Sequence, residues 1–519
     1  MLVEDQSEVI AFLSDVAAYA GRGLAGTVAR IDTHISHVFL VGDRVFKLKR
    51  AVKFPYLDFS SEPKRRAAAA AELTLNRRTA PELYLGLVVV ARAADGGLAL
   101  TDGGSTAAVD WLVEMRRFEQ ADVLDRMALD GRLSPALMVS VAEAVASFHA
   151  EAKVRRDLGG SDGLRHATEG IRGAFAESPE GLFEPAAVAA LLAASAAAIE
   201  RHAGLLDARR ADGFVRHCHG DLHLRNIALV ADRPVLFDCI EFSEEIATVD
   251  VLYDLAFLLM DLWHRGLRAH ANAAFNRYLE ITSDRGGLAA LPLFLGSRAA
   301  IRAHVTATTA GGTEDAGARK RLGADAREYL KLARAFLAPP APTLVAVGGL
   351  SGTGKTTLAR GLAPDLPPAP GALVLRSDVI RKEIAGVDPL TRLGDDGYTA
   401  EMTEATYDAI DERARAALAA GHSVVADAVN ARPEDRAALE AIAADAGTAF
   451  AGVWLEAPLK VLEARVSARS GDASDADAAI VRAAIDWDTG PIAWPRIEAS
   501  GSPDDVLARA RAALGEAGA

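Results

Sequence analysis

The stretch HCHGDLHLRN, residues 217–226, places three histidines, a cysteine and an aspartate within seven residues. Zinc sites use C-x₂₋₄-C or H-x₃₋₅-H separations, and His219 and His223 are four residues apart, but a third ligand would have to come from elsewhere. Cys218 beside His219 could form a nucleophile and its base, but adjacent strand residues point to opposite faces. Both interpretations are therefore weaker than one based on the aspartate and asparagine of the same stretch.

Asp221 and Asn226 are five residues apart, and Asp238 ends the apolar run VLFD twelve residues further on. This spacing resembles that of protein-kinase-like enzymes, in which the first aspartate accepts the proton of a substrate hydroxyl and the other two groups hold Mg²⁺. Asp221 is then the candidate base, and Asn226 and Asp238 are the candidate metal ligands. Cys218 and Cys239 are interpreted as small buried residues beside these groups.

A second set of residues fits phosphate binding. GLSGTGKT, residues 349–356, satisfies G-x-x-x-x-G-K-[ST], with the apolar run LVAV before it and the helical pattern TLARGLA after it. Glycines in such a loop let backbone N–H groups surround phosphates at a helix N-terminus. Lys355 is expected to reach the β- and γ-phosphates, and the Thr356 hydroxyl to hold Mg²⁺. The candidate nucleotide-binding residues are Gly349, Ser351, Gly352, Thr353, Gly354, Lys355, Thr356 and Thr357.

Charged residues that follow could serve the acceptor of the phosphoryl group. Asp378 follows the second strand-like run of this part, and Arg381 and Lys382 come one helical turn later. A carboxylate there can accept a hydroxyl proton, and the two bases can hold an anionic substrate. An N-capping aspartate followed by solvated charges is the alternative interpretation.

Three further residues could act on the metal or on the transferred phosphoryl group. Asp427 ends the run HSVVAD, a position suited to orienting a metal or water. Arg465 and Arg469 precede the polar stretch SGDASDAD and could neutralise phosphoryl charge when a lid closes. Exposed arginines on a helix are the plainer alternative for both.

The elements that must position these residues differ along the chain. Strand-like runs fill the opening third (HVFLVG, RVFKLK, LGLVVVAR and WLVEMRRF), with a hairpin turn expected at residues 42–43. From about residue 124 to 337 the pattern is helical except around 217–242, and strands alternate with helices after 343, as in a parallel α/β sheet. The proline-rich stretch 336–342 is a stiff linker.

These observations predict two domains. The first covers residues 1–335 and is a bilobal α+β protein-kinase-like phosphotransferase fold, with an N-lobe at about 1–115 and a C-lobe at about 118–335. The second covers residues 343–519 and is an α/β P-loop kinase with a parallel sheet. A chain of 519 residues is too long for one core, in agreement with this division.

Composition narrows the class of protein further. The net charge of −14, with no basic stripe, argues against binding duplex nucleic acid. No run of eighteen apolar residues indicates a membrane span, and the acidic first residues lack a signal pattern. Two cysteines cannot make a disulfide framework. We expect a cytoplasmic protein that does not associate with membranes, and the sequence does not predict its oligomeric state.

The motif HGDLHLRN with Asp238, followed by ATVDVLYDLAFLLMDL, resembles the aminoglycoside phosphotransferase and choline kinase family. That resemblance implies a strand lysine that anchors the nucleotide, for which RVFKLKR offers Lys47 and, as an alternative, Lys49. It also implies an acidic partner for this lysine, Glu72 with Glu62 as runner-up. The run VDWLVEMRRF resembles the hinge between lobes, which implies that the backbone of Glu114–Met115 meets the adenine.

Residues 343–500 resemble small P-loop kinases, a group that includes gluconate kinase-like enzymes, polynucleotide 5′-kinases and zeta-type toxins. The resemblance rests on GLSGTGKT, RSDVIRK, VVADAVN and RVSARSGDASDAD. Nearly the whole chain also resembles a bacterial family in which a phosphotransferase-like domain is fused to a P-loop kinase domain. None of these resemblances names a substrate.

Three functions are compatible with the sequence. The first is a kinase with two nucleotide sites that uses ATP, or GTP, with Mg²⁺ to phosphorylate hydroxyls of small molecules such as sugars, amino sugars or nucleosides. The second makes one domain a nucleotide-binding regulator of the other. The third has the P-loop domain phosphorylate a nucleic acid 5′ end or a nucleotide-sugar.

Overall fold

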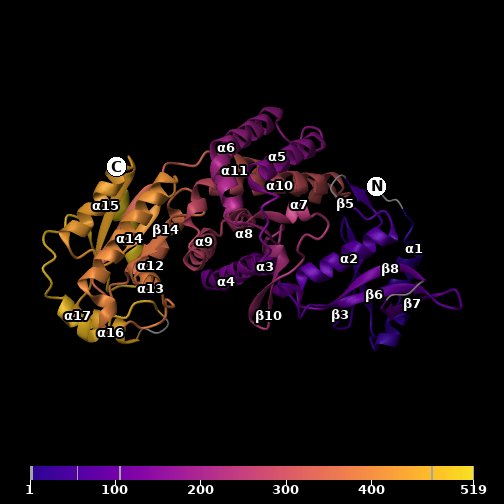
Figure 1. Ribbon diagram of the computed structural model, residues 1–519, viewed down its shortest axis with the longest axis horizontal. Coiled ribbons are helices and arrows are strands. Elements are labelled where there is room, and N and C mark those ends of the chain that lie inside the picture. Colours follow the sequence, from indigo (N-terminus) through magenta and orange to yellow (C-terminus); the bar gives the residue numbers. More distant parts are fainter. Residues whose placement is uncertain (1–3, 55–56, 104–106, 469–471, 518–519) are drawn as a thin grey trace. The chain divides into compact units, whose positions relative to one another are not determined.

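The computed structural model describes residues 4–54, 57–103, 107–468 and 472–517. The chain forms two compact units, one of residues 1–169 with 199–261 and one of residues 170–198 with 262–519. Each unit contains one sheet of five or six strands, shown with its helices in Figure 1. The predicted fold classes of both parts are confirmed, whereas the predicted boundaries at 335 and 343 stay a prediction.

The first unit begins with an antiparallel sheet in the order β1-β2-β3-β8-β6-β7. The strands are β1 (Val28–Asp32), β2 (Ser36–Val41), β3 (Arg44–Lys49), β6 (Tyr84–Arg92), β7 (Leu98–Asp102) and β8 (Ala108–Arg116). Val41 pairs with Arg44, so residues 42–43 form the predicted two-residue hairpin, in which Gly42 has φ 55°. Alternation in β2 and β3 buries Phe39, Val41 and Phe46 in one core, because successive strand residues face opposite sides.

Helix α2 (Glu62–Asn76) packs on this sheet and contributes Ala69 to a second core with Val113 and Trp111. Two short hairpin-like pairs follow in the chain, β10 (Ile227–Val230) with β11 (Arg233–Leu236), and β9 (Val215–His217) with β12 (Thr248–Asp250). The helices of this part include α1 (Ser7–Ser14), α3 (Leu124–Leu129), α4 (Pro135–Glu151), α7 (Glu244–Ala247) and the start of α8 (Val251–His264). The β9–β10 connection carries the HCHGDLHLRN stretch.

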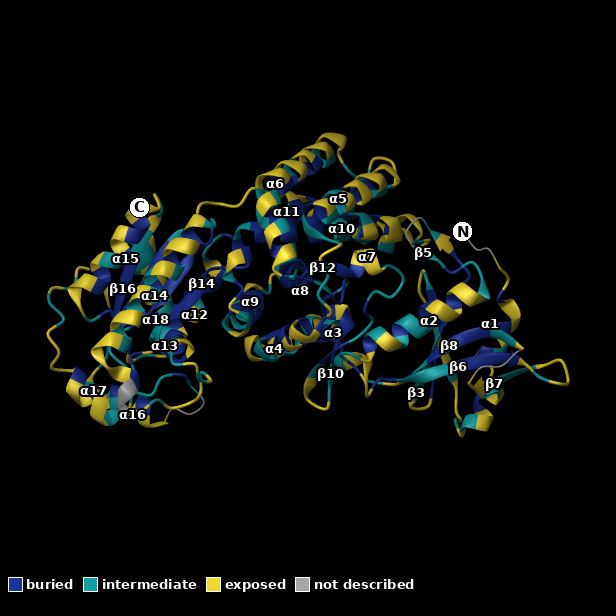
Figure 2. Ribbon diagram, viewed as in Figure 1, coloured by how far each residue is buried: buried dark blue, intermediate teal, exposed yellow. Residues whose placement is uncertain are grey.

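The second unit contains a five-stranded parallel sheet in the order β14-β15-β13-β16-β17. Its strands are β13 (Thr343–Gly349), β14 (Leu373–Arg376), β15 (Val424–Asp427), β16 (Ala449–Glu456) and β17 (Arg496–Glu498). β13, β14 and β15 are nearly continuous buried runs, as expected for a parallel sheet covered on both faces, and Figure 2 shows their burial. β14 is an edge strand of this sheet.

Helices on both sides of this sheet are α12 (Lys355–Leu362), α13 (Ser377–Ile384), α14 (Ala400–Ala419), α15 (Pro433–Asp445), α16 (Leu459–Ala468), α17 (Ala478–Ala484) and α18 (Pro503–Ala517). The same compact unit includes α9 (Arg268–Thr282), α10 (Leu291–Gly311) and α11 (Ala316–Leu337), which precede the proline-rich stretch.

Helices α5 (Gly160–Ala176) and α6 (Pro185–Ala211) complete the chain. Among the described residues, α6 is one helix long and apolar enough to cross a membrane, and 33% of its most apolar window is buried. Core helices of globular proteins share this length and composition, so the match alone assigns no membrane role.

Candidate active sites

The catalytic-loop candidates of the first unit lie together at the end of β9. The Asn226 side-chain amide donates to the Asp221 carbonyl and to the Asp221 carboxylate, both at 2.9 Å. Both bonds use the amide nitrogen, which leaves the amide oxygen available as a metal ligand. The Asp221 side chain is 37% exposed, so a substrate hydroxyl can reach it.

A buried aspartate of the run ATVDVLYDLAFLLMDL, to which the sequence assigned no role, holds this loop. Asp254, on α8, is fully buried and accepts the backbone N–H groups of Gly220 at 2.9 Å and His219 at 3.1 Å. The His149 ring nitrogen lies 3.2 Å from the same carboxylate. Three donors converging on one buried carboxylate restrict the loop backbone, because leaving any of them unpaired carries a desolvation cost of about 1–3 kcal/mol.

The structure shows which possible metal ligands lie close together near HCHGDLHLRN. Among the described residues, His149, Cys218 and Asp254 bring one ligand atom each to within 4.8 Å of one another, the spacing that a shared metal would need. Asp254 already serves the two loop N–H groups. His219 bonds to the Phe237 carbonyl at 2.9 Å. We therefore assign these side chains to bracing the loop.

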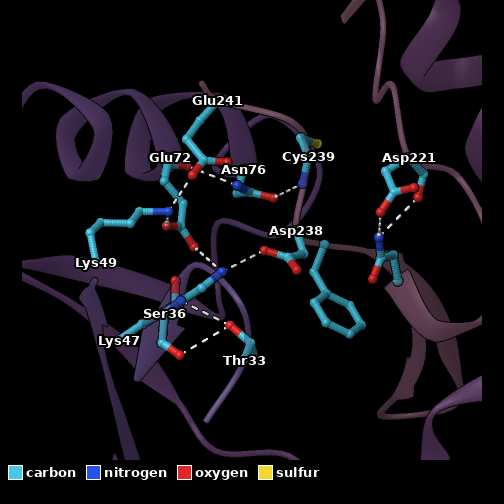
Figure 3. A network of polar contacts seen from close by, with 12 residues as sticks. Thr33, Ser36, Lys47, Lys49, Glu72, Asn76, Asp221, Asp238, Cys239 and Glu241 are labelled. Carbon is cyan, nitrogen blue, oxygen red and sulfur yellow. Dashed lines mark hydrogen bonds and ion pairs between the residues drawn. The ribbon is translucent and has the colours of Figure 1, made fainter. Parts of the chain in front are cut away.

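Lys47 connects the sheet to the metal-ligand candidate Asp238. Its ammonium lies 2.8 Å from the Glu72 carboxylate on α2 and 2.6 Å from the Asp238 carboxylate (Figure 3). Lys49, two residues further on the same face of β3, lies 2.5 Å from the other Glu72 oxygen and also pairs with Glu241. Of these two lysines, Lys47 is the one whose ammonium contacts the candidate metal ligand Asp238, and its role in binding the nucleotide stays a prediction.

The structure also separates the two candidates for the acidic partner of Lys47, Glu72 and Glu62. Glu62, the runner-up, accepts the Trp111 indole N–H instead of a lysine ammonium. Desolvation by the packed surroundings alone would raise the pKa of Glu72 and of Asp238. The attraction of Lys47 and Lys49 outweighs it, so both pKa values lie below the usual range. The pKa of Lys47 is raised well above its ordinary value, because its two carboxylate partners outweigh the effect of burial.

Two residues that the sequence did not single out hold the Asp238 segment, one at the end of α2 and one at the start of β6. Asn76, fully buried, accepts the Cys239 backbone N–H at 2.8 Å, and the Tyr84 hydroxyl accepts the Asp238 N–H at 3.2 Å. Asn76 lies one helical turn after Glu72, and this i,i+4 spacing is the signal that could have identified it.

The predicted hinge residues occupy a different kind of position. Glu114 and Met115 lie within β8, which pairs with β3 on one side and β6 on the other. Their backbone groups belong to these two ladders, and the Glu114 carboxylate pairs with Arg22 at 2.9 Å. The structure therefore does not support the adenine contact predicted at Glu114–Met115. The chain leaves the sheet after Arg116.

In the second unit the loop GLSGTGKT joins β13 to α12. Gly354 caps α12 with φ 93°, a conformation that glycine adopts without strain. A side chain at Gly352 would meet the Leu462 carbonyl at 2.9 Å, so the loop needs glycine there. The Thr353 hydroxyl donates to the Leu350 carbonyl at 2.8 Å, inside the loop, and Lys355 also points to that carbonyl at 3.2 Å.

A cavity of about 240 Å³ opens at this loop and brings most of the predicted residues together. Its lining includes Ser351, Gly352, Gly354, Lys355, Thr356, Thr357, Arg376, Ser377, Asp378, Asp427, Val429, Arg465, Asp472 and Ser474. The base candidate Asp378 and the metal candidates thus share one space with the phosphate loop. Arg376, Asp472 and Ser474 were missed, because nothing in their local sequence distinguishes them from surface residues.

Thr356 and Asp427 form the oxygen pair expected of a magnesium site. The Thr356 hydroxyl donates to the Asp427 carboxylate at 2.6 Å, and Asp427 is 4% exposed. Burial raises the pKa of Asp427, although Lys355 and Arg376 oppose the shift. A hard cation with oxygen ligands would offset the cost of burying this carboxylate, so the residues fit Mg²⁺.

The arginines and the lysine predicted around the acceptor do not all lie at the cavity. Arg465 lines the cavity and lies 3.4 Å from the Gly352 carbonyl, whereas Arg469 falls outside the described residues. Arg381 is buried and donates to the Gly397 carbonyl at 3.0 Å. Lys382 is 1% exposed and pairs with Asp475 at 2.8 Å.

The substrate contact predicted for Arg381 and Lys382 is therefore not supported. Neither residue lines the cavity, because α13 turns this face toward the loop that precedes α14. Asp475 also accepts the Tyr398 hydroxyl and the Leu393 N–H, so Lys382 is part of a clamp on the segment after α16.

Comparison with known proteins agrees with this geometry. A family model described as a phosphotransferase enzyme family matches residues 28–291, and one described as an AAA domain matches residues 344–491. The fold and the two sites define a chain of two kinase-type domains. By the first match, the chain belongs to the phosphotransferase enzyme family.

One relative is similar over most of this chain and another over a shorter stretch of it. An uncharacterized protein of Mycobacterium tuberculosis is 30% identical over 480 residues, which cover 88% of this chain and 90% of that protein. An adenylyl-sulfate kinase of Myxococcus xanthus is 34% identical over 118 residues, which cover 22% of this chain and 59% of that enzyme.

Two solved structures are similar to parts of this chain. A gluconokinase from Sinorhizobium meliloti is 22% identical, with a TM-score of 0.25, and covers 34% of this chain and 93% of its own. A choline/ethanolamine kinase family protein from Mesorhizobium loti is 15% identical, with a TM-score of 0.36, and covers 63% of this chain and 99% of its own.

Proposed function

We propose that this protein is a kinase with two independent nucleotide sites, each of which transfers the γ-phosphoryl group of ATP to a hydroxyl of a small molecule. The observation that carries the proposal is the convergence of Lys47, Glu72 and Asp238 at the first site. At the second site, the phosphate loop shares one cavity with Asp378 and the Thr356–Asp427 pair. A cytoplasmic location is part of the proposal, and two buried cysteines that form no disulfide support it.

At the first site Asp221 would accept the hydroxyl proton as the acceptor oxygen attacks. Asn226 holds the Asp221 carboxylate at 2.9 Å, which orients it, and the loop brace on Asp254 keeps both in place. Lys47, oriented by Glu72, would bind the phosphates. Bound Mg²⁺, held by Asn226 and Asp238, would neutralise phosphate charge, and the remaining work is positioning and charge stabilisation.

At the second site the backbone of the phosphate loop, Lys355 and Arg465 would bind the triphosphate. Asp378 would accept the proton of the acceptor hydroxyl from the opposite side of the cavity. Thr356 and Asp427 would hold the magnesium ion that accompanies the nucleotide.

The test is phosphoryl transfer from γ-labelled ATP to a panel of sugars, amino sugars, amino alcohols and nucleosides. It compares wild type with Asp221→Asn and Lys355→Met, each of which keeps the side-chain size. The matched controls are exposed residues of the same type, Asp212→Asn and Lys460→Met. Each site variant should lose its own set of acceptors by at least about 100-fold, the scale of a removed catalytic group.

The outcomes separate the alternatives. If Asp221→Asn leaves every transfer unchanged, the first domain is not a kinase of this type. If Lys355→Met weakens transfer at the first site while no acceptor depends on the second, the P-loop domain is a nucleotide-binding regulator. Adding 5′-hydroxyl oligonucleotides and nucleotide-sugars to the panel tests the remaining alternative, and the net charge of −14 favours small acceptors over polynucleotides.

A further inference from the structure

The edge strand β14 of the parallel sheet leads directly into the acceptor side of the P-loop cavity. Arg376, the last residue of β14, and Asp378, in the first turn of α13, both line that cavity. An edge strand leaves one row of backbone N–H and C=O groups unpaired by the sheet. The position of the acceptor-side segment therefore depends on what holds this outer row.

Helix α9 holds it through an asparagine amide. Asn276 accepts the Val374 backbone N–H at 2.7 Å and donates to the Ala372 carbonyl at 3.1 Å. The inner row is paired in the normal way, since the Leu373 N–H donates to the Ser423 carbonyl at 2.9 Å. On the outer side of β14, the Asn276 amide thus makes the hydrogen bonds to Ala372 and Val374 that a neighbouring strand would otherwise make.

The same contact includes Asn272, one helical turn earlier on α9. Asn272, which is 4% exposed, donates to the carbonyls of Pro370 at 3.2 Å and Ala372 at 3.0 Å. The Phe275 ring lies 5.1 Å from the His422 ring, on the far side of the same loop. A buried amide that makes its hydrogen bonds to one loop specifies a single arrangement, because moving it would leave polar groups unpaired.

A second contact reaches α13 itself. Glu383 accepts from Arg413 on α14 at 2.7 Å and from Ser283, just beyond α9, at 3.3 Å. Arg285 lies 3.5 Å from the same carboxylate. Helix α9 and its C-terminal end thus contact both the strand before Asp378 and the helix that carries it (Figure 1).

We propose that Asn276 is a positioning residue of the P-loop kinase, which is therefore completed by a helix outside its own family match. Helix α9 lies within residues 28–291, matched by the phosphotransferase family, whereas the AAA-domain match starts at residue 344. Nevertheless α9 and the P-loop sheet belong to one compact unit. This inference rests on the acceptor role proposed for the cavity, in which Asp378 must be held to within about 1 Å.

The nucleotide side of the cavity should not depend on α9. The phosphate loop follows β13, the central strand, and Asp427 ends β15. Loss of Asn276 should therefore raise the KM for the acceptor, or lower transfer, while nucleotide affinity stays the same. This split separates a positioning role from general destabilisation, which would lower both.

The experiment uses the full chain with Asn276→Leu, Asn276→Asp and, as a control on an exposed position of α9, Ala269→Ser. Leucine removes both bonds, whereas aspartate keeps an acceptor for the Val374 N–H. Hydrogen exchange read by mass spectrometry compares residues 373–384 with residues 344–362, and a fluorescent ATP analogue measures nucleotide affinity. Acceptor KM is added for any acceptor that depends on Lys355.

In Asn276→Leu we expect exchange in 373–384 to accelerate by about tenfold or more, exchange in 344–362 and nucleotide affinity to match wild type, and Asn276→Asp to restore most of the protection. Unchanged exchange in 373–384 would overturn the inference, as would equal acceleration in both segments. Exchange and nucleotide affinity need no acceptor, so this result stands even if the panel finds no acceptor for the second site.

Discussion

Replacing Lys49 with methionine removes an ammonium group from between two buried carboxylates. Lys49 and Glu72 are fully buried and Glu241 is 4% exposed, and Lys49 contacts both. Removing one partner of a buried ion pair costs about 3–5 kcal/mol, because the other charge is left unpaired. At about 2–4 °C per kcal/mol for a unit of this size, the transition of the first unit should fall by roughly 6–20 °C.

Lys47→Met is the matched comparison, since it removes the same group two residues away. Lys47 is 13% exposed and its partner Asp238 is 42% exposed, so solvent screens this pair. Glu72 also keeps Lys49. The expected loss of stability is about 1 kcal/mol or less, whereas transfer by the first site should fall at least about 100-fold. Lys49→Met should retain nucleotide binding at temperatures where it is folded.

The stability that Lys49→Met loses should depend on pH, because Glu241 and Glu72 have shifted pKa values. Burial raises the pKa of Glu241 despite Lys49, so its ionisation costs stability as pH rises through its folded pKa. Without Lys49 that pKa rises further. The pKa of Glu72 is lowered, so its contribution is present above about pH 4.3 and is lost as pH falls. The deficit of Lys49→Met should therefore be larger at pH 8 than at pH 5.

Urea unfolding at both pH values, followed by domain-resolved hydrogen exchange, measures these differences. The reasoning is refuted if Lys47→Met is the more destabilised variant, or if the Lys49→Met deficit is the same at pH 5 and pH 8. Loss of nucleotide binding in folded Lys49→Met would reverse the assignment of the two lysines.

Three other predictions follow from buried charges. Asp427→Asn, made in the Lys47→Met background, should keep or raise the melting temperature without ligand, because burial opposes ionisation of Asp427. The same variant should lose the stabilisation that MgATP gives. A melting temperature that MgATP still raises would contradict this prediction. Asp254→Asn should destabilise the first unit by about 1.5–3 kcal/mol in urea and reduce only first-site transfer, since it weakens charge-assisted bonds to the catalytic loop. Lys382→Met should destabilise the second unit by about 3–5 kcal/mol through its buried partner Asp475, whereas a raised acceptor KM with unchanged stability would restore the substrate role predicted from the sequence.

Several features of this protein could be predicted from local sequence patterns. The phosphate loop, the β2–β3 hairpin and the spacing of Asp221, Asn226 and Asp238 were all predicted, because each depends on residues close together in the chain. Strand alternation placed Lys47 and Lys49 on one face but could not separate them, since residues i and i+2 are equivalent in that pattern. Only the positions of Asp238 and Glu241, about 190 residues away, distinguish them.

The predictions that the structure does not support also concern contacts between residues far apart in the chain. Arg381 and Lys382 were assigned to substrate because their charge and spacing suit an anion, yet the orientation of α13 gives them to protein partners. Likewise, no property of Asn276 in its own helix indicates a bond to Val374, 98 residues further on.

By itself, the sequence determined the two fold classes and indicated candidate residues for both sites, because glycine loops, strand periodicity and carboxylate spacing are short-range properties. The tertiary structure decided which lysine contacts Asp238, which charges pair with protein partners, and which helix bonds to the edge strand β14. These choices depend on burial and on partners far along the chain, since the value of a charge or an amide is set by the groups it meets after folding.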